Sequence, residues 1–414
     1  MAKQDAINAE ATATGLAKPF RRKVFYIPGY DPIHPRRYRE LYRSEGAAQA
    51  ALSRYDLRLS PKTTKETYGW HVAGQIDGAA SEVDFEVLVW SDIVRGSMAQ
   101  GIVATYGQML RTAWAYIGSG ALFRLMRLRK GPMIAALYPI GMLIAQLALA
   151  LLLGWGGGRV AGWLHPALFW LAGAGIVAVV LRFCQRHDRY LYAYYLMHDY
   201  AYSAQSGGAY PTALEARMAE FRARIGAALT TDVAEVLVVG HSSGAHLAVS
   251  ILADLTRKGL PASHPALGLL SLGQVVPMVS FLPAAQRLRR DLHDLSACDD
   301  LTWIDVTAPG DGCAFALCDP VSVSGVAPVG KRWPLVVSAA FSQTLSPARW
   351  KSLRWRFFRL HFQYLCAFDN LPGETSDYDY FRITAGAATL GQRYAGRSPS
   401  KSRIETARSG FRSI

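Results

Sequence analysis

The most chemically suggestive residues of the chain are the five at positions 240–244, which read GHSSG. They follow the apolar segment 236–239 and open a largely apolar stretch that predicts a helix from Ser243 to Arg257. Small residues two positions before and after a serine permit a strained strand-to-helix turn that lifts the hydroxyl above the sheet edge. The helix N-terminus then faces the negative charge that develops on an attacked carbonyl. The pattern predicts Ser242 as a nucleophile and the N–H of Ser243 as an oxyanion donor.

This motif, set between a buried strand and an apolar-faced helix, resembles the nucleophile elbow of the α/β-hydrolase superfamily, specifically of its lipase/esterase-like members. The resemblance covers about 23–90 and 233–364 and leaves out the long apolar segment between them. It implies an α/β fold with a mostly parallel sheet flanked by helices. It also implies a catalytic triad in the order Ser, Asp or Glu, His, and hydrolysis through an acyl-enzyme.

That order narrows the choice of base and acid. Of the ten histidines, only His361 lies far beyond the candidate acids, and no glutamate occurs between it and Ser242. We therefore expect His361 to be the base, although its aromatic and basic surroundings also suit a surface or packing histidine. Asp311 is the preferred acid because it follows a predicted strand at 303–306, where the superfamily carries its acid. Asp305, within that strand, and Asp319 are the alternatives.

A second oxyanion donor is expected from the loop after the first predicted strand, at 24–27. The loop reads Pro28-Gly29-Tyr30-Asp31 and is placed like the HG-type oxyanion loop of the superfamily. The resemblance points to the backbone N–H of Tyr30. The chain departs from the family's pattern in having Pro28 where a histidine is usual.

Two long segments, 131–158 and 160–181, contain no Lys, Arg, Asp or Glu. A helix needs about 20 apolar residues to cross a bilayer, so both are long enough. They predict a transmembrane helical hairpin over 131–182 that turns at the glycine-rich residues 154–159; the alternative is a buried hairpin in a soluble domain. Residues 98–130 predict an amphipathic interfacial helix. The tyrosine-rich stretch after Arg182 suits either an interfacial belt or a helix that packs back on the globular part.

The charge distribution supports a membrane rather than a nucleic-acid partner. The net charge is +14, and basic residues flank the two apolar segments and fill 349–359 and the C-terminal tail. By the positive-inside rule, both ends of the hairpin and the globular part face the cytoplasm. Five cysteines without a paired spacing fit a reducing compartment. No metal, P-loop or Rossmann signature occurs, so we expect no cofactor and no metal.

The predicted organisation is as follows: a disordered leader (1–20), the first part of the hydrolase-type domain (21–97), the interfacial helix (98–130), the hairpin (131–182), the second part of the domain (183–390) and a basic disordered tail (391–414). The expected activity is hydrolysis of an ester or thioester of a lipid or other long-chain acyl group. The alternatives are acyl transfer with the same triad, and a catalytically inactive scaffold that binds a partner at the membrane. The sequence does not indicate the oligomeric state.

Overall fold

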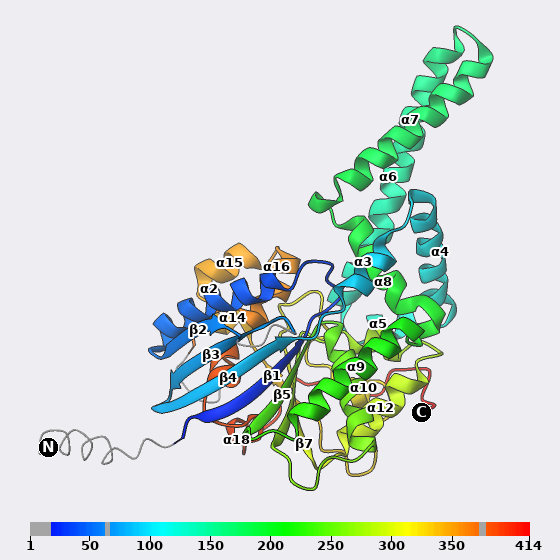
Figure 1. Cartoon of the computed structure of the whole chain (residues 1–414). Coiled ribbons are helices and arrows are strands. Elements are labelled where there is room, and N and C mark those ends of the chain that lie inside the picture. Colours follow the sequence, from blue (N-terminus) through cyan, green and yellow to red (C-terminus); the bar gives the residue numbers. More distant parts are fainter. Residues whose placement is uncertain (1–17, 63–66, 372–377) are drawn as a thin grey trace, which may run out of the picture.

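The computed structural model describes residues 18–62, 67–371 and 378–414, and a sheet of eight strands lies at its centre (Figure 1). The spatial order is β2-β3-β4-β1-β5-β6-β7-β8. The strands are β1 (Phe20–Ile27), β2 (Asp56–Pro61), β3 (Gly69–Ile76), β4 (Ala79–Val87), β5 (Glu235–His241), β6 (Ala266–Leu272), β7 (Leu301–Thr307) and β8 (Leu335–Ser338). All neighbours from β4 to β8 pair in parallel, whereas β3 is antiparallel to both β2 and β4. The expected α/β class with a mostly parallel sheet is confirmed.

The central strands are buried on both faces, and their side chains alternate between two apolar cores. In β1, Val24 and Tyr26 enter one core, and Phe25 and Ile27 enter the other. The first core lies under α2 (Arg36–Ser53), α14 (Phe341–Thr344), α15 (Pro347–Leu353), α16 (Phe357–His361), α17 (Tyr380–Ala385) and α18 (Leu390–Arg393). The second lies under α3 (Ser91–Met98), α9 (Thr212–Ala228), α10 (Gly244–Arg257), α11 (Val276–Ser280) and α12 (Gln286–Ser296).

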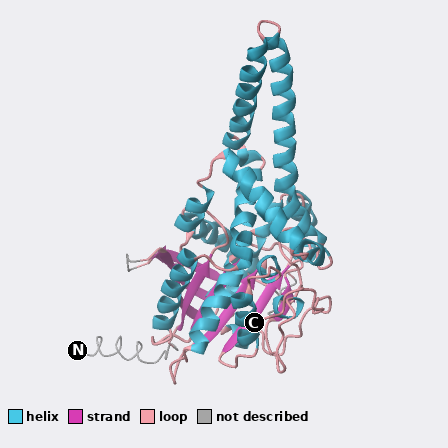
Figure 2. Ribbon diagram, turned by 90° about the vertical axis from the view of Figure 1, so that its right-hand side faces the viewer, coloured by secondary structure: helices cyan, strands magenta, loops and turns pink. Residues whose placement is uncertain are grey.

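Two long helices, α6 (Lys130–Gly162) and α7 (Pro166–Arg186), pack side by side and project from the α/β body as a hairpin (Figures 1 and 2). Both are long and apolar enough to cross a membrane, and most of their surface is exposed. At the base of the hairpin lie α4 (Ile102–Gly118), α5 (Ala121–Met126) and α8 (Ala193–Ala204). The remaining short elements are α13 (Pro320–Val323) and 3-10 turns at Asp188–Tyr190, Gln205–Gly208 and Gln363–Leu365.

The expected turn of the hairpin at 154–159 was wrong, because α6 continues through these residues and the chain reverses only at 163–165. The glycines of this segment instead allow α6 to pack closely against α7. A Cβ on Gly154 would lie 2.8 Å from the carbonyl oxygen of Gly173, and one on Gly158 would lie 2.7 Å from that of Phe169. Small residues at this four-residue spacing let two helix backbones approach closely.

The region 98–130 was also predicted too simply. It is not one interfacial helix but the end of α3, then α4 and α5, separated by short turns. Helix α4 is nevertheless two-sided: Met109, Thr112 and Tyr116 are buried, whereas Leu110 and Trp114 are exposed. Helix α4 lies beside the base of the hairpin (Figure 1).

The prediction of a disordered tail from 391 onward was wrong. The N–H of Ile404 donates to the Leu317 carbonyl (2.7 Å), and the Ile404 carbonyl accepts from the N–H of Asp319 (3.0 Å). Near the end of the chain, the Ser413 carbonyl accepts from Nε of the buried Arg289 (2.8 Å). The tail is held by hydrogen bonds of its backbone. Because these do not depend on apolar side chains, the amino-acid composition did not predict that the tail is ordered. The predicted leader falls largely on 1–17, outside the described residues.

Candidate active site

Ser242 occupies the turn between β5 and α10 with φ of 57°, in the left-handed region that side chains rarely adopt. Its flanking glycines are sterically required. A Cβ on Gly240 would lie 2.7 Å from the Gly244 carbonyl oxygen, and one on Gly244 would collide with the carbonyl oxygen of Ile27. The serine hydroxyl is therefore presented at the carboxyl end of the parallel strands, at the start of α10.

Ser242 and His361 line the same cavity of about 80 Å³. No direct hydrogen bond joins their side chains in the described structure, as is common in sites without substrate. Gly273, which follows β6 with φ of 53°, allows the imidazole to lie against the strand end, since a Cβ there would lie 3.1 Å from Cε1 of His361. The sequence reasoning did not identify Gly273.

Asp311 is the acid that reaches His361: its Oδ2 lies 2.7 Å from Nδ1 of the imidazole. The same oxygen accepts from the Tyr364 hydroxyl (3.0 Å), and Oδ1 accepts from the N–H of Cys313 (2.9 Å). Burial alone would raise the pKa of Asp311, but the neighbouring His361 and these hydrogen bonds bring it below its ordinary value. Asp311 is thus ionised and fixes the orientation of the ring.

The two alternative acids lie elsewhere. Asp305 is buried within β7, accepts from the Ser271 hydroxyl (2.6 Å), and has its pKa raised to about 8 by burial. Asp319 caps α13 through the N–H groups of Val321 and Ser322 and pairs with Lys331 (2.5 Å). Neither has a hydrogen bond or ion pair to His361.

The loop that was expected to donate to an oxyanion lies directly against the serine. A Cβ on Gly29 would lie 2.9 Å from Cβ of Ser242. The N–H groups of Tyr30 and Ser243 have no hydrogen-bond partner among the described residues. The loop is held by Asp31, which accepts from the Arg37 guanidinium (2.8 Å) and from the Tyr38 hydroxyl (2.5 Å). Both proposed donors are therefore free and adjacent to the serine.

Helix α8 covers the cavity, and its contribution was missed by the sequence reasoning. Tyr195, Asp199 and Ser203, spaced four residues apart, all line the cavity with Tyr200. Burial raises the pKa of Asp199 to about 7, with His361 acting in the opposite direction. Of the two predictions for the tyrosine-rich stretch, a helix that packs back on the globular part is confirmed for 193–204, whereas Tyr190 and Tyr192 before it are exposed. The four-residue spacing of polar groups was the only signal in the sequence.

Two further histidines near the serine are uncharged. His241, with Nε2 3.0 Å from the His361 carbonyl oxygen, and His246, with Nδ1 3.0 Å from the Tyr210 hydroxyl, are both buried. Burial lowers the pKa of each to about 3. His241 therefore supports the backbone of His361 and does not compete with it as a base.

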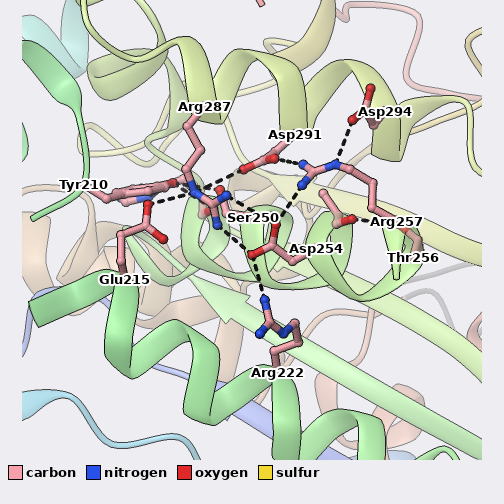
Figure 3. A network of polar contacts seen from close by, with 12 residues as sticks. Tyr210, Glu215, Arg222, Ser250, Asp254, Thr256, Arg257, Arg287, Asp291 and Asp294 are labelled. Atoms are coloured by element: carbon pink, nitrogen blue, oxygen red, sulfur yellow. Dashed lines mark hydrogen bonds and ion pairs between the residues drawn. The ribbon is translucent and has the colours of Figure 1, made fainter. Parts of the chain in front are cut away.

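A polar network fastens the elbow helix α10 to its neighbours (Figure 3). Asp254 of α10 pairs with Arg222 of α9 (3.3 Å) and with Arg287 of α12 (2.8 Å). The Tyr210 hydroxyl, at one end of the network, lies 3.1 Å from the hydroxyl of Ser250, which is also on α10. These contacts hold the helix that carries the serine turn.

Among the described residues, one group could offer three ligands to a metal: Asp311, Cys313 and His361, whose ligand atoms lie within 4.8 Å of one another. In this arrangement the Asp311 carboxylate and the imidazole are bonded to each other. Burial also raises the pKa of the Cys313 thiol well above its ordinary value, which disfavours the thiolate that metals bind. The donor set fits a hydrogen-bonded acid–base pair better than a metal centre.

Comparisons with protein-family models, curated proteins and solved structures found no match to the chain.

Proposed function

We propose that the chain is a membrane-anchored serine hydrolase of the α/β-hydrolase type, acting on an ester or thioester. One observation carries the proposal: a serine on a strained strand-to-helix turn shares a cavity with a histidine whose Nδ1 lies 2.7 Å from a buried carboxylate. Serine hydrolases on several unrelated folds use this set of groups.

In the proposed reaction, Ser242 Oγ attacks the acyl carbon while His361 Nε2 takes the hydroxyl proton. The N–H groups of Tyr30 and Ser243 stabilise the oxyanion. The bond to the leaving group breaks, and the leaving oxygen or sulfur takes the proton from His361. Water then attacks the acyl-serine with the same help, and the acid is released. Asp311 keeps the Nδ1 proton on the imidazole and stabilises its charged form.

The hairpin of α6 and α7 is proposed to cross the membrane, with the α/β body in the cytoplasm. Support comes from the exposed apolar surface of both helices and from the basic residues at their outer ends, including Arg127 and Arg186. Pro132, in the first turn of α6, lines the cavity with Ser242. The cavity therefore lies at the base of the proposed anchor, which favours an acyl substrate that resides in the membrane.

The first test is labelling of membrane fractions with a fluorophosphonate probe. Native protein is expected to react, Ser242→Ala to lose all labelling, and His361→Ala to lose most of it. Ser203→Ala, a serine of the same cavity, serves as the matched control and keeps its labelling. Absence of labelling in folded native protein would overturn the proposal.

A further inference from the structure

The strongest unexplained feature of the site is the carboxyl group of Asp199. It lines the catalytic cavity from α8, together with the hydroxyl of Ser203 one turn further on. Neither side chain has a hydrogen bond or ion pair to any described residue, and Asp199 is half-buried. A desolvated carboxyl group without a partner weakens a fold, so stability does not account for its presence.

Among the described residues, His361 is the basic group whose charge acts on Asp199, while Arg37 nearby is paired with Asp31 of the same cavity wall. The titratable groups that act on it or feel its charge are His361 from α16, the Cys313 thiol from the acid loop, and tyrosines from three parts of the fold: Tyr30, Tyr116, Tyr195 and Tyr200. Burial shifts the pKa of every one of these tyrosines and of Cys313 upward, so they are neutral at pH 7. No Lys or Arg lies among them, which leaves the carboxylate open to a positive charge from outside the protein.

Aromatic side chains form a large part of the remaining cavity wall. Besides Tyr195 and Tyr200, it includes Phe358 and Phe362. Ring faces attract cations, and aromatic cages are a known environment for substituted ammonium groups. Two carboxylates line the cavity; Asp31 is paired with Arg37, whereas Asp199 has no ion-pair partner among the described residues.

We propose that Asp199 and the aromatic walls of the cavity bind an ammonium group on the leaving alcohol, so that the substrate is the acyl ester of an amino alcohol. The proposal rests on the proposed hydrolase function. The leaving alcohol takes its proton from His361, and Asp199 is close enough to His361 to feel its charge. The carboxyl group thus lines the same cavity as the imidazole that protonates the departing alcohol. Hydrolysis of such an ester consumes water and yields the acid and the free amino alcohol.

The binding should depend on pH with a definite sign. A bound ammonium group favours the ionised form of Asp199, whose pKa in the empty site is about 7. Affinity for the cation should thus rise as the pH increases from 6 to 8, while affinity for an uncharged analogue of the same shape stays constant.

The experiment measures how two small alcohols slow fluorophosphonate labelling of Ser242 in the full-length membrane-bound protein. Choline and its uncharged isostere 3,3-dimethylbutan-1-ol differ only in the charged nitrogen. We expect choline to protect the native protein at a concentration at least about tenfold lower than the isostere, the difference expected of one charged contact. Asp199→Asn should abolish the preference, whereas Asp232→Asn, an exposed carboxyl far from the cavity, should keep it.

Equal protection by the two alcohols, or a preference that survives Asp199→Asn, would overturn the inference while labelling still upheld the hydrolase proposal. The labelling of Asp199→Asn itself reports whether that variant folds, and the pH dependence in native protein needs no variant. If native protein is not labelled at all, the hydrolase proposal fails. Calorimetry then measures choline binding to native protein and to Asp199→Asn independently of labelling. Binding that is lost in Asp199→Asn supports the ammonium site, and absence of such binding overturns it.

Discussion

Asp305 and Asp311 lie close together in the sequence, yet their surroundings give them opposite charge states at pH 7. Asp311 is ionised against His361, whereas burial raises the pKa of Asp305 to about 8. Replacing Asp311 with Asn should lower the rate of Ser242 labelling by roughly 10³-fold, because the amide stabilises the wrong tautomer of the imidazole. Asp305→Asn should change the rate little. Time courses of labelling check both, and equal losses would contradict the choice of Asp311 as the acid.

The same buried Asp305 predicts a pH dependence of stability. Its pKa in the folded protein, about 8, is above the ordinary value of 3.8, so the native state binds the extra proton between these values. The protonated Asp305 therefore stabilises the fold at low pH. This contribution to the free energy of unfolding falls by about 1.4 kcal/mol per pH unit as the pH rises from about 4 to 8. Asp305→Asn should melt higher, relative to native protein, at pH 8 than at pH 5. A constant difference between the two melting temperatures would refute this.

At the residue scale, the sequence was sufficient where a motif fixed local geometry. The GHSSG motif predicted the strand-to-helix turn that carries Ser242, and chain order pointed to His361, which lines the same cavity. Asp199 could not be found in this way, because its role depends on how α8 packs over the cavity. That packing is set by contacts from distant segments, such as the hydrogen bond (2.5 Å) from the Tyr195 hydroxyl to the carbonyl of Tyr30.

The loop between β1 and α2 needs its glycine for contact with the serine. A Cβ on Gly29 would lie 2.9 Å from Cβ of Ser242, so Gly29→Ala should displace the hydroxyl and lower labelling by roughly 10²-fold. Gly96 in α3 has open space around its Cβ position, and Gly96→Ala should leave labelling unchanged. Labelling rates and melting temperatures of the two variants, compared with native protein, test the contact. Unimpaired labelling in Gly29→Ala would show that the loop is not tight against the serine.

The hairpin offers a matched pair of glycines. A Cβ on Gly154 would meet the Gly173 carbonyl oxygen at 2.8 Å and Cγ2 of Val177 at 2.7 Å, whereas Gly156 has nothing near its Cβ position. Gly154→Ala should therefore destabilise the helix pair by about 1–3 kcal/mol, while Gly156→Ala should be neutral or mildly stabilising. Melting in detergent measures the difference. Indistinguishable variants would mean that the helices do not approach as closely as described.

These glycines also explain why the sequence placed the turn of the hairpin at 154–159 and not at 163–165. A run of glycines is compatible with a loop and with a close helix contact, and only the facing residues on α7 distinguish the two. Strand positions were easier to predict, because short alternating or continuous apolar runs between turn residues are typical of strands.

For the molecule as a whole, the proposed orientation places the α/β body and the hairpin tip on opposite sides of the membrane. Trp163→Cys at the exposed tip should react with a membrane-impermeant maleimide in intact cells, and Val329→Cys on the body should react only after lysis. Native protein provides the background from its own cysteines. Labelling of both variants only after lysis would contradict a hairpin that crosses the bilayer.

The order of the C-terminal tail was not predictable from composition at this scale. Its basic and small residues have little apolar surface to bury, and such segments are usually disordered. Order comes from the strand-like contact of Ile404 with Cys318 and from Arg289 bound to the Ser413 carbonyl. These partners are far away in the sequence.

The first turn of α6 lies against the acid loop: a Cβ on Gly131 would be 3.2 Å from Cα of Gly312, next to Asp311. Helix α6 thus begins beside the loop that carries Asp311 and, in the proposed placement, continues through the lipid. Bilayers of different thickness tilt such helices to different degrees. The surrounding lipid would then act as an outer part of the catalytic scaffold, and exchanging it for detergent would alter the support of Asp311 without changing a single residue.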